Sequence, residues 1–168
     1  FFGKPLRTAF AAMAPDQVDE LVRSYREYNL ARHDQMAKLF PEVKETLQML
    51  HQSGLKLGIV TSKTSELAIR GLNLHQLVPY FDSIIGCEEC LRHKPDPAPV
   101  LAALEAMNLS PEKSLMVGDA PADILSGQRA GCKTAAVRWT LLNWNELESL
   151  QPNYFLSRFS DLQKICLP

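Results

Sequence analysis

Three stretches of the chain decide its fold: KLGIVTSK at residues 56–63, HKPDPAPV at residues 93–100 and LMVGDAPADILSGQRAG at residues 115–131. The first and the third each begin with a short apolar run and then turn polar, a pattern typical of a buried strand followed by a loop and a helix. Strands that alternate with helices in this way predict a parallel α/β sheet. Because such sheets bind ligands beyond the carboxyl ends of their strands, the polar residues at those ends are the candidate site.

The same alternation extends over the rest of the chain from Pro41 onward. Pro41 suits the first position of a helix, and Gly54 suits the position just after its end. The apolar runs and turn signals predict strands at residues 55–60, 81–85, 114–117, 133–137 and 154–156. They predict helices at residues 65–72, around 100–107 and at 160–165, and a further helix that contains Ile124 and Leu125 and is closed by Gly131. We therefore expect an α/β core over residues 39–168, with right-handed connections and helices on both faces of the sheet.

The first 38 residues have no strand signal and predict a separate helical piece. Val18, Leu21, Val22 and Tyr25 recur at helical spacing, which predicts a helix over about residues 15–32. Residues 1–14 predict a shorter helical piece after a Gly-Lys-Pro turn. The domain prediction is thus a partial helical cap at 1–38 followed by the core.

Composition excludes several classes of protein. The 168 residues carry 18 basic and 19 acidic side chains, a net charge of -1, with no dense basic run, so neither a nucleic acid nor a membrane surface is expected as a partner. No apolar stretch approaches the roughly 20 residues that span a bilayer, and no signal peptide is evident. We expect a cytoplasmic protein that could form a homodimer. Cys87 and Cys90 are interpreted as ordinary thiols, because a structural zinc site needs four ligands and no second pair is present.

Polar residues follow three of the predicted strands and define a phosphate and magnesium site. Thr61 and the backbone near Ser62 could hold phosphate oxygens, and Lys94 could neutralise charge on the phosphoryl group. Asp119 and Asp123 are oxygen ligands of the kind that Mg²⁺ prefers. Each residue alone has a plainer explanation. Ser62 or Thr64 could cap the next helix, Lys94 could be a solvated loop residue, and His93 is interpreted as a loop histidine.

In their order and spacing, IVTSK, HKPDP and GDAPADILSGQRAG resemble the second, third and fourth motifs of the haloacid dehalogenase superfamily. The segment GKPLRTAF…YREYN resembles the helical cap of its phosphoglycolate-phosphatase-like members, and the further segments KLGIVTSK and AVRWT resemble PpaX-type inorganic pyrophosphatases within that group. The resemblance implies a Mg²⁺-dependent phosphohydrolase acting on pyrophosphate. It implies that Thr61 and Lys94 are catalytic, that Ser62 helps to bind substrate, and that Asp119 and Asp123 serve the metal. Ala120 departs from the pattern, since many relatives have a small hydroxyl residue there.

The first motif of the family, Asp-x-Asp, occurs nowhere in the 168 residues. In the family it supplies the aspartate that attacks phosphorus, and it ends a strand at the centre of the sheet. We therefore expect that strand, its flap and the first cap helix to precede Phe1.

Other functions stay open at this point. Phosphoglycolate or another small phosphomonoester could be the substrate. The chain could instead be a non-catalytic fragment, or a relative that only binds phosphate. A receiver-type signalling domain also uses strand-end acids, a threonine and a lysine, but its acids come early in the chain. A zinc or redox protein built on Cys87 and Cys90 is the least favoured.

Overall fold

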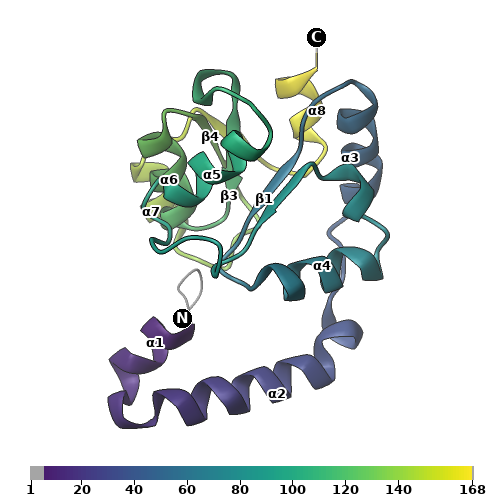
Figure 1. The fold of residues 1–168 in the computed structure, drawn as a ribbon. Helices are drawn as coiled ribbons and strands as arrows, with labels where there is room; N and C mark the ends of the chain where they lie inside the picture. Colours follow the sequence, from purple (N-terminus) through teal and green to yellow (C-terminus); the bar gives the residue numbers. More distant parts are fainter. Residues whose placement is uncertain (1–5, 168) are drawn as a thin grey trace.

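The computed structural model describes residues 6–167 and places a helical segment beside two parallel sheets (Figure 1). The segment consists of α1 (Leu6–Met13), a 3-10 turn η1 (Pro15–Gln17) and the long α2 (Val18–Met36). These helices confirm the helical character predicted for the N-terminal part, although the expected Gly-Lys-Pro turn lies outside the described residues. Within residues 6–167, no helix combines the length and the apolar character needed to cross a membrane.

Among residues 6–167, five short strands, all paired in parallel, form the two sheets. In the first sheet β1 (Gly58–Val60) pairs with β2 (Ser83–Ile85), with Val60 opposite Ile85. In the second the order is β3–β4–β5, made of β3 (Leu115–Gly118), β4 (Lys133–Val137) and β5 (Tyr154–Leu156). The parallel α/β prediction is confirmed. The strand predicted at 55–60 is shorter than expected, because only residues 58–60 pair with β2.

The remaining helices cover the sheets. They are α3 (Val43–Gln52), α4 (Ser65–Leu74), η2 (Val78–Tyr80), α5 (Ala98–Ala106), η3 (Pro111–Lys113), α6 (Pro121–Ala130), α7 (Trp144–Ser149) and α8 (Asp161–Cys166). Helix α5 packs against β1, β2 and α6, while α6 packs against β3 and β4. Helix α3 packs against α8. Because α5 contacts the first sheet and α6 the second, these two helices join the sheets through their mutual contact.

Two local predictions need correction. The helix expected to start at Pro41 begins at Val43, because Glu42 has a left-handed backbone with a φ of 65°. Helix α7 was not predicted at all. It is only six residues long, too short to show a period in the sequence, yet Asn143 caps it by accepting a hydrogen bond from the Asn145 amide at 3.1 Å. Its Leu147 is fully buried against Ile124 and Ala136, so tertiary packing specifies this helix.

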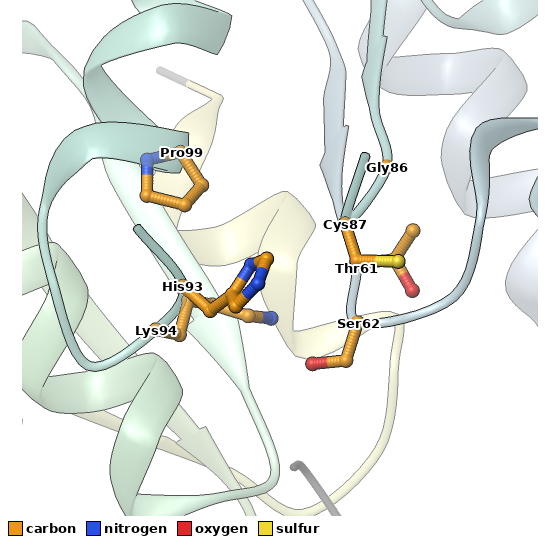
Figure 2. A pocket seen from close by; sticks show the side chains of 7 residues that line it. All are labelled: Thr61, Ser62, Gly86, Cys87, His93, Lys94 and Pro99. Atoms are coloured by element: carbon orange, nitrogen blue, oxygen red, sulfur yellow. The ribbon is translucent and has the colours of Figure 1, made fainter. Parts of the chain in front are cut away.

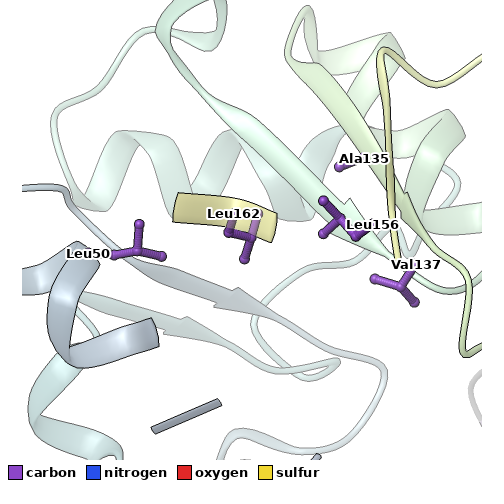
Figure 3. Close-up of a cluster of buried hydrophobic side chains, with 5 residues drawn as sticks. All are labelled: Leu50, Ala135, Val137, Leu156 and Leu162. Atoms are coloured by element: carbon purple, nitrogen blue, oxygen red, sulfur yellow. The ribbon is translucent and has the colours of Figure 1, made fainter. Parts of the chain in front are cut away.

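The main core cluster lies where α8 meets both α3 and the second sheet (Figure 3). Leu162 of α8 lies between Leu50 of α3 and the strand residues Val137 and Leu156. Each of these side chains is at most 6% exposed. Burial of an aliphatic side chain of this size stabilises a fold by roughly 1.5–3 kcal/mol. Helix α8 therefore links α3, which neighbours the first sheet, to the second sheet.

The two sheets do not join, and a cleft of about 530 Å³ lies between them. Residues of β1 and β3 line it from opposite sides, and apolar side chains of α5 and α8 complete its walls. The lining residues are Leu50, Gly54, Leu55, Lys56, Leu57, Gly58, Val60, Val100, Ala103, Leu104, Met107, Leu109, Glu112, Lys113, Ser114, Leu115, Met116, Val117, Cys132, Lys133, Tyr154, Leu162, Ile165 and Cys166. Since β1 pairs only with β2 and β3 only with β4, each strand presents one unpaired backbone edge to this cleft.

Candidate functional site

Thr61 stands directly after β1, at the carboxyl edge of the first sheet. Its amide continues the ladder by donating to the carbonyl of Ile85 at 3.0 Å, and its hydroxyl oxygen accepts from the Lys63 amide at 3.1 Å. The cap of α4 is Thr64, whose hydroxyl oxygen accepts from the Leu67 amide at 3.4 Å. Of the two residues that the sequence offered as the cap, Thr64 fills that position, and the Thr61 hydroxyl takes no part in capping the helix.

Lys94 is not a solvated loop residue. Its ammonium donates to the Val60 carbonyl at 2.9 Å and to Oδ1 of Asp123 at 2.7 Å. The side chains of Lys94 and Asp123 are only 9% and 11% exposed. The pair joins the end of β1 in one sheet to the start of α6 beside the other sheet. An ammonium ion held this firmly in a poorly hydrated place is suited to stabilising negative charge.

The loop that carries Lys94 is anchored to α6. Ser126 Oγ donates to the Asp96 carbonyl at 2.8 Å, and Arg129 Nη1 donates to the Pro95 carbonyl at 2.8 Å. Ser126 and Arg129 are three residues apart and so share one face of the helix. The sequence prediction missed both residues. The only signal in the sequence was their helical spacing after GDAPAD, which does not say which loop they face.

Asp123 organises the start of α6 as well as holding Lys94. Its Oδ2 accepts hydrogen bonds from the amides of Asp119 at 3.2 Å and Ala120 at 3.1 Å, so the carboxylate caps the first turn of the helix. Gly118 makes this possible, because a Cβ at that position would overlap the side chain of Asp123. The sequence GDAPAD thus brings one carboxylate against two amides and one ammonium.

Asp119 directly follows β3 and is an exposed residue at the same edge of the sheet. Its carbonyl accepts a hydrogen bond from Thr140 Oγ1 at 2.8 Å, which ties it to the loop after β4. Desolvation, and next to it the negative charge of Asp123, raise the pKa of Asp119 above its ordinary value. When the surroundings of a carboxylate disfavour its negative charge, a bound cation stabilises the charged form.

Seven residues line a small pocket beside this arrangement: Thr61, Ser62, Gly86, Cys87, His93, Lys94 and Pro99 (Figure 2). Thr61, Ser62 and Lys94 are thus brought together, as the sequence indicated. Asp123 does not line the pocket but forms an ion pair with Lys94. Asp119 neighbours Asp123 but is not part of the pocket lining. Gly86, Cys87 and His93 were not predicted. Burial, followed by the charge of Glu88, raises the pKa of the Cys87 thiol, which makes it a poorer nucleophile.

The carboxylates fit a magnesium ion better than a structural transition metal. Among residues 6–167, no group of three or more His, Cys, Asp or Glu side chains is placed to hold a metal. Mg²⁺ commonly takes only one or two protein carboxylates and completes its shell with water and substrate phosphate. Asp119, whose pKa is raised by its surroundings, and the neighbouring Asp123 match that requirement.

A parallel α/β fold that gathers a hydroxyl, a buried lysine and two carboxylates at one edge defines a Rossmann-like phosphate-handling enzyme. Comparison with known families agrees. A model of the haloacid dehalogenase-like hydrolases matches residues 1–137, and the chain belongs to this family.

Two curated relatives are pyrophosphatases named PpaX. The chain is 42% identical to the one from Anoxybacillus flavithermus, covering 98% of this chain and 77% of the relative. It is 40% identical to the one from Bacillus thuringiensis, covering 98% and 76%. Roughly a quarter of each relative therefore has no counterpart among the residues of this chain.

Solved structures of the family show the same fold. A haloacid dehalogenase-like hydrolase from Streptococcus pneumoniae superposes with a TM-score of 0.86 at 28% identity, covering 98% of this chain and 78% of that one. A predicted phosphoglycolate phosphatase from Haemophilus somnus gives 0.82 at 28% identity, covering 89% and 67%.

Proposed function

We propose that this chain carries the phosphate- and magnesium-binding half of an inorganic pyrophosphatase. The observation that carries the proposal is the buried Lys94–Asp123 pair, which fixes an ammonium ion, a group suited to binding a small anion, in a pocket that Thr61 also lines. Similarity to the PpaX pyrophosphatases over nearly the whole chain supports pyrophosphate as that anion.

Each residue then has a defined task. The Thr61 hydroxyl and the backbone near Ser62 hold oxygens of the phosphoryl group that is transferred. Lys94 offsets the negative charge that gathers on these oxygens as the new bond forms, where such groups contribute most. Asp119 holds Mg²⁺ and Asp123 assists it mainly by orienting Lys94 and the amides of Asp119 and Ala120. When bound, Mg²⁺ would neutralise charge on the phosphate oxygens.

The attacking group in this proposal is an aspartate on a strand that occupies the cleft between β1 and β3. A strand placed there in parallel would end between Thr61 and Asp119, because both stand at the carboxyl edges of the strands that flank the cleft. Its carboxylate would displace one phosphate from pyrophosphate to form an aspartyl-phosphate, which water then hydrolyses. The unmatched quarter of the relatives is long enough to supply such a strand.

The test separates binding from turnover. Titration calorimetry of the 168-residue chain with pyrophosphate and Mg²⁺ should show binding that Lys94→Met abolishes, while Lys38→Met, a change on the exposed segment after α2, leaves it intact. Hydrolysis should stay at background for the chain alone. It should appear when an apolar strand ending in Asp-x-Asp is fused ahead of residue 1, and vanish when its first Asp is replaced by Asn.

Two outcomes would contradict the proposal. Magnesium-dependent hydrolysis by the 168 residues alone would place the attacking group within them. Equal binding by the wild-type chain and Lys94→Met would show that the pocket is not the phosphate site. Phosphoglycolate, run in parallel, tests the substrate, and a clear preference for it over pyrophosphate would make the chain a phosphomonoesterase of the same family.

A further inference from the structure

His93 lines the pocket with a side chain that can donate a hydrogen bond, yet the proposed reaction gives it no task. It immediately precedes Lys94, and its ring projects from the loop toward Ser62 and Thr61 across the pocket (Figure 2). Unlike the side chain of Lys94, which is 9% exposed, His93 lies on the solvent side. The two residues therefore line the pocket at different depths, with the ammonium ion inside and the imidazole at the mouth.

Lys94 is placed to serve only the inner phosphate. Its ammonium already donates to Val60 and Asp123, and three donors are all that it has. One donor remains for an anion at the inner end of the pocket. A diphosphate, however, extends further out than a single phosphate and brings additional negative charge with it. That second phosphate needs its own donor.

The pocket lining offers few candidates for this donor. Of the seven lining residues, only Lys94 and His93 can carry a positive charge. An imidazole can donate a hydrogen bond to phosphate in its neutral or its protonated form. The Glu88 carboxylate lies near Gly86 on the Cys87 side of the pocket, where Oε1 accepts hydrogen bonds from the amide and the hydroxyl of Ser65, so an outer phosphate is expected on the opposite, His93 side.

We propose that His93, together with Ser62, binds the outer phosphate of a diphosphate and so makes the pocket prefer diphosphates to single phosphates. This inference rests on the proposed function, because it assumes that the inner phosphate lies at Thr61 and Lys94. It assigns to His93 a specificity role that the loop position alone did not suggest. The chemical class of ligand is an unhindered diphosphate whose outer end stays near solvent.

Calorimetric titration of the 168-residue chain in Mg²⁺ tests this with two probes, pyrophosphate and orthophosphate. Loss of one hydrogen bond to a charged group should weaken pyrophosphate binding about tenfold in His93→Ala. Orthophosphate binding should change less than about twofold. His93→Gln, which keeps a donor, should recover part of the pyrophosphate affinity. His51→Gln is the matched control, since this exposed histidine of α3 contacts the Tyr80 ring and is not among the residues that line the pocket.

The outcomes distinguish the inference from the function on which it rests. Unchanged pyrophosphate binding in His93→Ala, or an equal loss for both probes, overturns the role of His93 while binding by the wild-type chain still supports the pocket. The titrations are run below the melting transition of the wild-type chain, and failure of that folded chain to bind either probe overturns the pocket and with it the inference. A circular dichroism melt of each variant identifies any that has lost its fold, and His93→Gln then decides the outcome in place of His93→Ala.

Discussion

At the scale of single residues, the Lys94–Asp123 pair carries both structure and chemistry. Both side chains are nearly buried, and Asp123 also caps α6. Removing one charge leaves the other buried without a partner. We expect Asp123→Asn to lower the free energy of unfolding by about 3 kcal/mol. Urea denaturation should show this as a lower midpoint at unchanged slope. A loss of less than about 0.5 kcal/mol would mean that water already solvates the pair.

Replacing Asp119 should have the opposite effect on stability to replacing Asp123, because its raised pKa shows that its negative charge is unfavourable in the folded chain. A carboxyl whose folded pKa is raised destabilises the fold once pH rises above the ordinary value of 3.8. Without metal, Asp119→Asn should therefore raise the melting temperature at pH 7, and the gain should disappear as pH falls below about 3.8.

Magnesium should reverse the order of stability of the two proteins. Because the proposed site holds Mg²⁺ only in the folded wild-type chain, Mg²⁺ should raise the melting temperature of the wild type and not that of Asp119→Asn. Melting curves at pH 7 with and without millimolar Mg²⁺ measure both effects. Equal stabilisation of both proteins by Mg²⁺ would remove Asp119 from the metal site.

At the scale of elements, a bidentate salt bridge between Arg70 and Asp34 connects the helical segment to the α/β core. Asp34 of α2 accepts from Nε and Nη2 of Arg70 in α4, both at 2.9 Å, and from the ring of His33 at 2.9 Å. The hydrogen bond from Arg70, and next that from His33, lowers the pKa of Asp34 to about 2. This contact fixes the end of α2 against α4.

The lowered pKa predicts how that junction responds to acid. A depressed carboxyl pKa stabilises the fold above the ordinary value of 3.8, and this contribution is lost as pH falls toward 2. Asp34→Asn should speed hydrogen exchange in the last turn of α2 at pH 7 and leave α6 unaffected. Since the pair is exposed, the change in melting temperature should be small. Unchanged exchange in α2 would show that the pair does not hold the segment.

At the scale of the whole molecule, the cleft between β1 and β3 should lower the stability of the fold, because it leaves one edge of each strand without a partner. Two strand edges with unpaired backbone groups face a largely apolar space of about 530 Å³. Buried backbone groups without partners cost roughly 1–3 kcal/mol each, against a total stability of about 5–15 kcal/mol for typical proteins. We therefore expect the isolated chain to melt at low temperature and with little cooperativity.

Filling the cleft should reverse that instability. A synthetic apolar strand of about six residues should raise the melting temperature in a concentration-dependent way, because at a hundred times its Kd it adds about 2.7 kcal/mol to the free energy of unfolding. The same peptide with N-methylated backbone amides cannot pair with a strand edge and serves as the control. A sharp, peptide-independent melt of a monomer would show that the cleft closes by itself. Size-exclusion chromatography identifies a second copy of the chain as the alternative occupant.

The sequence by itself determined the parallel α/β class, the strands after residue 80 to within two residues, and the placing of Thr61, Ser62 and Lys94 together. These were predictable because apolar periodicity is local, and because the carboxyl ends of parallel strands share one edge. Metal binding by Asp119 and Asp123 stays a prediction.

Only the tertiary structure decided what depends on contacts between distant residues. The burial of Lys94 against Asp123 joins positions 29 residues apart, and Ser126 and Arg129 hold a loop 30 or more residues away. Helix α7 forms because Leu147 is buried by residues of α6 and β4. His93 faces the pocket because of the path of its loop, which no local pattern records. Packing and strand pairing act across the chain, so their outcome is a property of the assembled molecule.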